Sequence, residues 1–295
     1  MPRFAYQTVD VFTDRPFGGN PLAVFTDARG MTDAQMQALA AEMNYSETTF
    51  VLPPDDPAHD ARVRIFHRTA EMPFAGHPNV GTAWVLARQC RDRGGILRFE
   101  QTAGLVEIAI DRDQTGEVSG AVIAAPQPLS RGLELTVEEV APCAGLEAAD
   151  LVTAAHPPVQ ASVGVSFVLA QVAPAALARA TPDLAAFRAL SARHPGLAGR
   201  VSLFLYVRDG SAIRARMFAP LAGTWEDPAT GSASATLGAL LLSLDGGEAA
   251  AFSITQGVEM GRPSQLRVSA HRDQDGVRAR VGGSCAPMFH GEAVL

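Results

Sequence analysis

Lysine is absent from this chain of 295 residues, and all 24 of its basic residues are arginine. This absence excludes enzymes that hold pyridoxal phosphate or a substrate as a lysine Schiff base, and it excludes nucleotide-binding P-loops, which need a lysine. Cysteine is scarce as well. Cys90, Cys143 and Cys285 are widely spaced and include no CxxC pair, so we expect reduced, buried thiols, with a catalytic thiol as the open alternative.

Several longer signals are also missing. No apolar run reaches the roughly 18 residues of a membrane helix, and residues 1–12 form a strand pattern without a signal region, so we expect a cytoplasmic protein that contacts no membrane. The seven histidines show neither HxH nor HExxH spacing, which argues against a metal site. No GxGxxG fingerprint is present, which argues against a nucleotide cofactor. The net charge of −7 argues against nucleic acid as a partner.

Two short glycine motifs stand out among the residues that are present. GHPNVG occupies residues 76–81 and DPATGS occupies residues 227–232, and each follows a strand-like run and opens a run of small, helix-forming residues. The N-terminus of a helix has unpaired N–H groups and a partial positive charge, so each motif can bind a carboxylate or a phosphate. Two related helix starts in one chain predict two similar halves that face one anion-binding cleft.

Short strands alternate with one long apolar helix in each half of the chain, at about residues 79–89 and 232–244. This alternation predicts an α+β fold in which a sheet wraps each helix. Thr32 is the expected N-cap of another helix at residues 33–43, and the segment 124–130, which contains two prolines, is the expected linker. The predicted strands are residues 6–12, 22–25, 48–52, 62–67, 96–101, 105–110, 166–170, 201–207, 213–218, 253–255, 265–269 and 277–281, and a further helix is predicted at residues 184–192.

Glu47 is the strongest candidate for acid/base chemistry. It lies at the junction between the helix at residues 33–43 and a strand of β-branched and aromatic residues, so a rigid element would hold its carboxyl group. Apolar neighbours can raise the pKa of such a group towards neutrality. The alternative is a glutamate at a helix end or on an edge strand, with its side chain facing water.

The glycine motifs contain further polar candidates. His77 could share a site with a bound anion or could be a structural histidine near the N-cap of its helix. Asp227 could cap the second helix, or it could face the cleft as a second acid/base group or a ligand for an ammonium group. Thr230 and Ser232 are either capping hydroxyls or ligands for the substrate.

Taken in order along the chain, these motifs resemble those of the PhzF family, the phenazine-biosynthesis isomerase-like proteins of the diaminopimelate epimerase fold. GHP at residues 76–78 and EDPATGSA at residues 226–233 are together specific for the family. The other matching segments are residues 10–12 and 19–24, SET at 46–48, the turn-rich run 256–264 and the glycine pair 282–283.

The resemblance implies two similar domains, each a mostly antiparallel β-sheet curled around a central α-helix, with the active site between them. We expect an N-terminal domain at residues 1–125, joined by a C-terminal strand at about 280–295, and a C-terminal domain at residues 126–280. The resemblance further implies an enzyme that needs no cofactor and forms a homodimer.

The resemblance also assigns roles to individual residues. Glu47 matches the catalytic glutamate of the family, and His77 and Asp227 match its other catalytic polar residues. The remaining matches are expected to bind the substrate: Gly76, Thr230, Gly231 and Ser232. Related epimerases use a pair of cysteines, but here those neighbourhoods contain Ala75 and Asp227-Pro228, which argues against two-thiol racemisation.

The sequence therefore predicts a cofactor-independent isomerase in which Glu47 shifts a proton on a small carboxylate. One alternative within enzymes is a racemase, epimerase or dehydratase that acts at the α-carbon of an amino acid. Another alternative, of a different class, is a small-molecule-binding protein whose site is vestigial.

Overall fold

The computed structural model describes all residues from Met1 to Leu295, and the chain divides into two compact units. Unit 1 comprises residues 1–124 and 282–295, and unit 2 comprises residues 125–281. Each unit contains a set of paired β-strands and one central helix, so the predicted α+β class is confirmed. None of the helices has the length and apolar composition needed to span a membrane.

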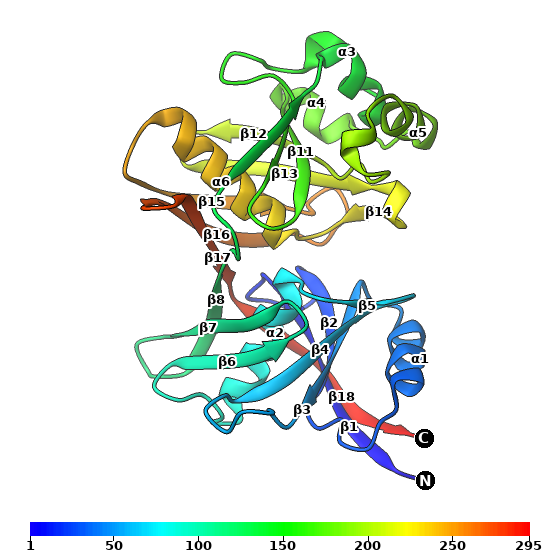
Figure 1. Cartoon of the computed structure of the whole chain (residues 1–295), viewed down its shortest axis with the longest axis vertical. Helices are drawn as coiled ribbons and strands as arrows, with labels where there is room; N and C mark the ends of the chain where they lie inside the picture. The colour runs from blue at the N-terminus through cyan, green and yellow to red at the C-terminus, as the bar shows by residue number, and fades with distance from the viewer. The chain divides into compact units, whose positions relative to one another are not determined.

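Unit 1 is built around one buried helix. Its helices are α1 (Asp33–Met43) and α2 (Gly76–Arg88), and its strands are β1 (Arg3–Val11), β2 (Asn20–Phe25), β3 (Glu47–Leu52), β4 (Ala61–His67), β5 (Glu71–Met72), β6 (Ile96–Gln101), β7 (Gly104–Arg112), β8 (Val118–Ala124) and β18 (Cys285–Val294). Figure 1 shows α2 enclosed by strands of this unit. Every residue from His77 to Ala87 is buried, as expected for a helix that is apolar on all sides.

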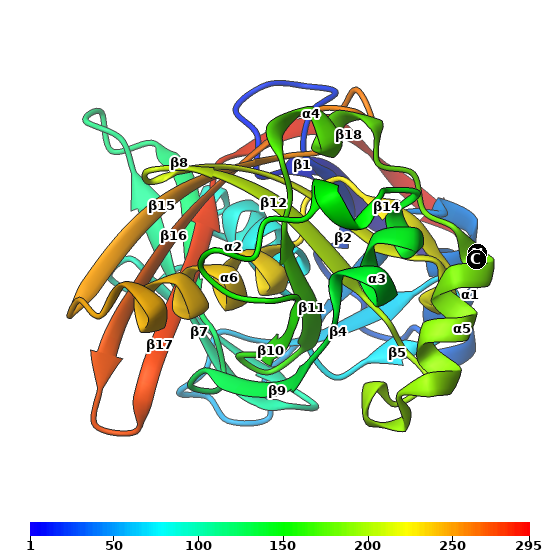
Figure 2. The same ribbon diagram turned by 90° about the horizontal axis from the view of Figure 1, so that it is seen from above.

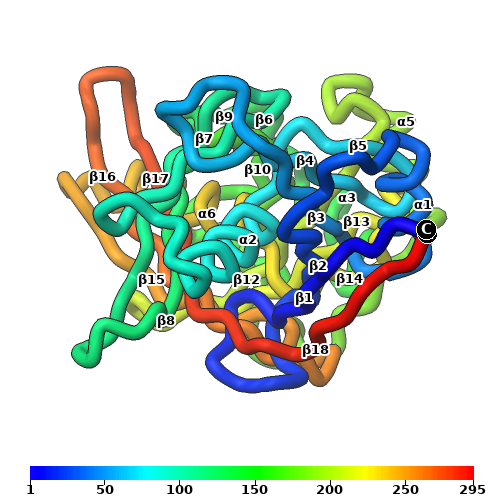
Figure 3. The backbone as a smooth tube through the Cα atoms, turned by 90° about the horizontal axis from the view of Figure 1, so that it is seen from below, coloured from blue at the N-terminus to red at the C-terminus, as the bar shows by residue number.

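The strands of unit 1 lie in the spatial order β18–β1–β2–β3–β4–β6–β7–β8. Neighbouring strands are antiparallel except for two parallel pairs, β2–β3 and β4–β6. Figure 3 shows β1 in blue and β18 in red running side by side to the ends of the chain. The last strand of the sequence therefore completes the sheet that the first strand begins.

Unit 2 repeats this scheme. Its helices are α3 (Val137–Val140), α4 (Pro174–Arg179), α5 (Leu184–Arg193) and α6 (Gly231–Asp245), its 3₁₀ turns are Ala141–Ala144, Ala148–Asp150, Pro195–Leu197 and Pro220–Ala222, and its strands are β9 (Ser130–Glu134), β10 (Val159–Ser162), β11 (Ser166–Gln171), β12 (Leu203–Asp209), β13 (Ala212–Ala219), β14 (Thr224–Asp227), β15 (Ala249–Gln256), β16 (Ser264–Asp273) and β17 (Gly276–Gly283). Figure 2 shows α6 alongside β15 and β16. Its strand order is β9–β10–β11–β12–β13–β15–β16, with parallel pairs at β11–β12 and β13–β15.

The two units therefore share one strand pattern. In each unit, at least one helix follows the strand that begins the first parallel pair. A short strand then pairs with the strand that begins the second parallel pair, and the central helix comes next. Thus α2 corresponds to α6, and both begin at a glycine of a motif seen in the sequence. The prediction of two similar halves is confirmed.

A second glycine in each central helix allows the sheet to approach closely. A Cβ atom on Gly81 would lie 2.6 Å from Cδ2 of Leu22, and one on Gly238 would lie 2.4 Å from Cγ1 of Val268. Real Cβ atoms do not approach other atoms this closely, because cores are packed to the density of organic crystals. These glycines let each sheet contact its helix backbone.

The structure changes several boundaries predicted from the sequence. The first central helix begins at Gly76 and not near Asn79, so all six residues of the motif GHPNVG belong to the helix. Ala75 is the N-cap, so His77 is the second residue of the helix and lies two positions inside the N-cap that it was expected to be near. The short strand Thr224–Asp227 lies where the sequence predicted no strand.

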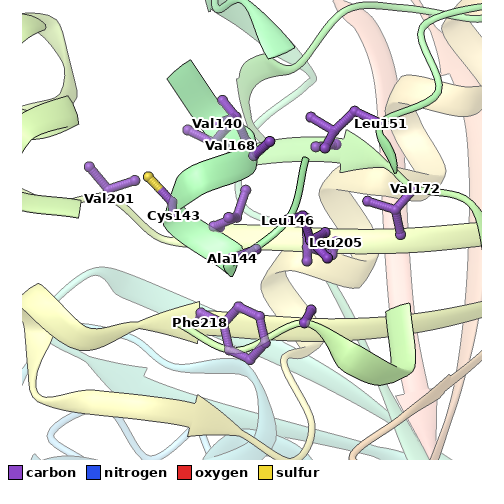
Figure 4. Packing of buried hydrophobic residues seen from close by; sticks show 14 of the residues in the cluster. Val140, Cys143, Ala144, Leu146, Leu151, Val168, Val172, Val201, Leu205 and Phe218 are labelled. Carbon is purple, nitrogen blue, oxygen red and sulfur yellow. The ribbon is translucent and has the colours of Figure 1, made fainter. Parts of the chain in front are cut away.

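Unit 2 also has a separate hydrophobic cluster, formed where α3, α4 and α5 pack on one side of its sheet. Figure 4 shows Cys143 in this cluster with Val140, Val201 and Phe218 nearby. Burial of Cys143 raises the pKa of its thiol to about 12, so the group stays protonated and behaves as a small apolar side chain.

Candidate active site

Glu47 is held at a rigid junction in unit 1. Helix α1 is followed by its C-cap, Asn44, which adopts a left-handed conformation with φ of 53°, and β3 begins three residues after Asn44 with Glu47 itself. The backbone of Glu47 pairs with Leu22 on the parallel side and with His67 on the antiparallel side. Its side chain is only 14% exposed. The predicted position at a helix-to-strand junction is confirmed, and the alternative of a glutamate that faces water is wrong.

His77 faces Glu47 from the first turn of α2. Its Nε2 atom lies 3.4 Å from Oε2 of Glu47, and its side chain is 7% exposed. Burial lowers the pKa of His77 from 6.5 to about 3, because desolvation disfavours the charged imidazolium. The imidazole ring is therefore neutral near pH 7, and its neighbour Glu47 is an anion when deprotonated.

Asn20 and Ser46 complete this cluster, and neither was predicted from the sequence to be a site residue. Nδ2 of Asn20 lies 3.5 Å from Nδ1 of His77, and the hydroxyl of Ser46 donates to Oδ1 of Asn20 at 2.8 Å. Asn20 is 1% exposed. Two features of the sequence could have indicated these residues. Asn20 is a polar residue at the start of an apolar strand, and Ser46 directly precedes the candidate acid/base residue Glu47.

The start of α2 leaves backbone N–H groups without a side-chain cap, because its N-cap is Ala75. Asn79 fixes this turn by donating to the carbonyl of Ala75 at 3.0 Å, and its amide also bonds with Gln101 of β6. Gly76 is the first residue of the helix. The motif at residues 76–81, which the sequence predicts to bind an anion, thus lies at a helix N-terminus without a side-chain cap.

In unit 2, Asp227 ends β14 and Thr230 is the N-cap of α6. Thr230 donates its hydroxyl to Oδ2 of Asp227 at 2.6 Å and its N–H to Oε1 of Gln256 at 3.0 Å. Gln256 is fully buried, and its Nε2 donates to the carbonyl of Asp227 and to Oγ1 of Thr230. Gln256 therefore fixes the turn between β14 and α6, a role that the sequence did not reveal.

Gly231 and Ser232 form the first turn of α6. The side chain of Thr230 makes no capping bond to this turn, and the turn contains no acidic residue. Its backbone N–H groups therefore keep the partial positive charge that attracts an anion. Asp227, Thr230, Gly231 and Ser232 thus form one continuous group in unit 2, as Glu47 and His77 do in unit 1.

A buried ion pair supports the strand that carries Asp227. Both nitrogens of the Arg216 guanidinium fork donate to Glu226, at 2.8 and 2.9 Å, and Nη1 of Arg216 also donates to the carbonyls of Leu177 and Ala180 near the end of α4. The two charged side chains are 8% and 11% exposed. Glu226 is therefore a structural residue of the motif EDPATGSA, while its neighbour Asp227 is the candidate for chemistry.

Comparison with known proteins identifies the relationship. Residues 9–291 match the family described as phenazine biosynthesis-like protein, PhzC-PhzF. The chain belongs to this family. It is 38% identical to an uncharacterized isomerase of Mesorhizobium japonicum, with 98% of each chain covered, and 36% identical to the trans-2,3-dihydro-3-hydroxyanthranilate isomerase of Pseudomonas aeruginosa, with 98% of this chain and 99% of the relative covered.

The fold comparison agrees with the sequence comparison. The crystal structure of a Bacillus anthracis PhzF-family phenazine biosynthesis protein superposes with a TM-score of 0.87 at 26% identity, and all of both chains is covered. The resemblance stated from the motifs is therefore confirmed. This PhzF-family chain is an enzyme of the isomerase class, like the relatives that share its length and fold.

The cysteines of this PhzF-family isomerase lie outside the two groups of site residues. All three are free thiols. Cys143 and Cys285 are buried as expected, and burial raises the pKa of both thiols. Cys90 is exposed, just beyond the end of α2, so the expectation of burial was wrong for this residue.

Proposed function

We propose that this PhzF-family isomerase moves a proton between two carbons of a small carboxylate substrate, with Glu47 as the acid/base group. The observation that carries the proposal is the pair formed by Glu47 and His77, with 3.4 Å between Oε2 and Nε2 in an almost fully buried position. A carboxylate held on a strand and facing a neutral imidazole can accept a proton from carbon and return it to a neighbouring position.

The proton balance of the proposed step is simple. Glu47 as a carboxylate takes a proton from one carbon of the substrate, and the electron pair of the broken C–H bond moves into the conjugated system. The resulting carboxylic acid then gives a proton to another carbon, so substrate and product have the same composition. The neutral ring of His77, with a proton on Nε2, would place a partial positive charge 3.4 Å from Oε2 of Glu47 and so stabilise the carboxylate before the transfer.

The backbone at the two helix starts is proposed to bind the negative charge of the substrate. Gly76 on α2 and Gly231 and Ser232 on α6 lie in first turns without a side-chain cap, where N–H groups favour anions. Thr230 and Asp227 are proposed to orient the polar groups of the substrate, because Gln256 holds their turn in place.

The names of the relatives support a proposal for the substrate class. The Pseudomonas aeruginosa relative is named for its action on trans-2,3-dihydro-3-hydroxyanthranilate, a cyclic amino-acid-like carboxylate, and it matches this chain over almost its whole length. We propose a substrate of the same chemical class. The homodimer that the motif resemblance implies remains a prediction, which sedimentation of the purified protein would test. The cytoplasmic location expected from the sequence is also a prediction, which fractionation of cells would test.

The test is isotope exchange in D₂O, with trans-2,3-dihydro-3-hydroxyanthranilate and a panel of cyclic and linear amino acids, followed by mass spectrometry. We expect the native enzyme to place deuterium on carbon in at least one compound. Glu47→Gln should abolish this exchange and still bind the ligand, because the amide keeps the size of the side chain and loses its basic oxygen.

Glu42→Gln is the matched control, because Glu42 is an exposed glutamate on the neighbouring α1 and its substitution should leave exchange unchanged. Exchange that persists in Glu47→Gln would remove Glu47 from the mechanism. Exchange with inversion at an α-carbon would favour the racemase alternative.

A further inference from the structure

Four polar side chains in unit 1, those of Ser46, Asn20, His77 and Glu47, form a line of polar contacts, and the tautomer of His77 decides the donor and acceptor at its two ring nitrogens. The Ser46 hydroxyl donates to Oδ1 of Asn20, Nδ2 of Asn20 faces Nδ1 of His77, and Nε2 of His77 faces Oε2 of Glu47. The separations are 2.8, 3.5 and 3.4 Å. Ser46 lies in the link between α1 and β3, and Asn20 is the first residue of β2. His77 lies in the first turn of α2, and Glu47 is the first residue of β3.

Both ends of this line require the same tautomer of His77. A carboxylate can only accept hydrogen bonds, so the nitrogen that faces Glu47 must be the one that carries the proton. A neutral imidazole has one N–H, so Nδ1 is then the acceptor, and the amide nitrogen of Asn20 is a donor that suits it. The opposite tautomer would set two donors against each other at Asn20 and two acceptors against each other at Glu47.

The hydrogen bond from Ser46 favours one orientation of the Asn20 amide relative to His77. With its hydroxyl proton given to Oδ1, the amide presents its NH₂ group to the ring. If the amide rotated by half a turn, its oxygen would face Nδ1 and favour a proton there. The orientation of a buried amide is thus coupled to the proton position on the ring 57 residues away in the sequence.

We propose that Asn20 and Ser46 are positioning residues that hold His77 in the Nε2–H tautomer, so that the ring donates to Glu47 and is not itself a base. The inference rests on the proposed role of Glu47 in proton transfer. The 3.5 Å contact lies at the long end of the hydrogen-bond range, and the 3.4 Å contact between Nε2 of His77 and Oε2 of Glu47 lacks hydrogen-bond alignment, so its preference for a proton on Nε2 is electrostatic.

The first measurement is the tautomer itself, read from ¹⁵N–¹H NMR of the full-length protein labelled at histidine nitrogens. The signals of His77 are assigned by their loss in His77→Gln. We expect Nε2 to be protonated and Nδ1 to be the unprotonated nitrogen in the native protein. A proton on Nδ1 of the native ring would overturn the proposal, whatever the activity of the enzyme.

Asn20→Asp keeps the shape of the side chain but replaces the donor that faces Nδ1 of His77 with an acceptor. An ionised aspartate accepts at both oxygens, so we expect Nδ1 of His77 to become protonated and kcat to fall by tenfold or more, with little change in KM. Unchanged protonation of Nδ1 in this variant would contradict the proposal. A tautomer change with native kcat would leave the assignment of the proton intact and refute its importance for catalysis.

Two further variants separate positioning from simple loss of stability. Ser46→Ala should allow the Asn20 amide to rotate and give a mixture of tautomers with a smaller loss of kcat, and Ser46→Thr, which keeps the hydroxyl, should restore the native signals. Thr49→Val removes the buried 2.8 Å bond between the hydroxyls of Thr49 and Thr82 in the same unit. It should lower stability and change neither the tautomer nor kcat.

Discussion

At the scale of single residues, His77 has the clearest consequence for behaviour in solution. Its pKa falls from 6.5 to about 3 in the folded protein because the ring is buried. Between these two pH values the unfolded chain binds a proton at His77 and the folded chain does not. Folding stability therefore rises with pH across this window, and it is lost as the pH falls from about 6.5 towards 3.

We expect His77→Gln to remove this part of the pH dependence. The free energy of unfolding, measured by urea denaturation between pH 7 and pH 4, should fall less steeply in the variant, by up to about 1.4 kcal/mol per pH unit. His290→Gln, which alters an exposed histidine, should keep the native slope. Parallel curves for native protein and His77→Gln would contradict the neutral, buried state of the ring.

The sequence predicted Glu47 and His77 because each belongs to a motif that ends or begins an element. It did not predict Asn20, Ser46 or Gln256 as parts of a site, because their function depends on contacts across long stretches of chain. Asn20 meets His77 over 57 residues, and Gln256 meets Thr230 over 26. A single sequence gives no measure of such distances, whereas local capping patterns are visible in it.

At the scale of elements, local chemistry decided which boundaries were predictable. The bounds of α1 were predicted correctly because Thr32 and Gln35 form a capping box, in which the N–H of each residue donates to the side chain of the other. The strand β9 was missed because all five of its residues are exposed, so it lacks the alternation of buried and exposed residues that marks a strand.

The Arg216–Glu226 ion pair gives a prediction for one element, the strand β14 that carries Asp227. Glu226→Gln leaves the guanidinium charge buried without its partner anion, and we expect a loss of about 3 kcal/mol in the free energy of unfolding. The matched control is Glu259→Gln, which breaks a pair with Arg214 on the same strand as Arg216, where the arginine side chain is 51% exposed.

Chemical denaturation of both variants tests this difference. The exposed pair should contribute less than about 1 kcal/mol, because solvent screens its charges. Equal losses in Glu226→Gln and Glu259→Gln would show that burial does not strengthen the dependence of Arg216 on its partner. Activity of Glu226→Gln should also fall, since β14 ends at Asp227.

At the scale of the whole molecule, one unit is continuous in the sequence and the other is built from two separate segments. Unit 2 is one continuous segment, residues 125–281, whereas unit 1 is assembled from residues 1–124 and 282–295. Strand β18 pairs with β1 from Arg3 to Val11, and its residues Cys285 and Ala286 are buried. Residues 1–124 alone would therefore expose the open edge of β1.

We expect the segment 125–281 to fold when expressed alone, with cooperative thermal unfolding and native-like circular dichroism. The segment 1–124 should be poorly folded and should aggregate through the free edge of β1, and a peptide of residues 282–295 added in trans should restore cooperative unfolding. A peptide of the same composition with the order of its residues scrambled is the control, because it cannot reproduce the alternating burial that the register with β1 requires.

Cooperative folding of residues 1–124 without the peptide would show that β18 is dispensable for unit 1. Failure of residues 125–281 to fold would show that the repeated topology does not make the second unit an independent folding unit.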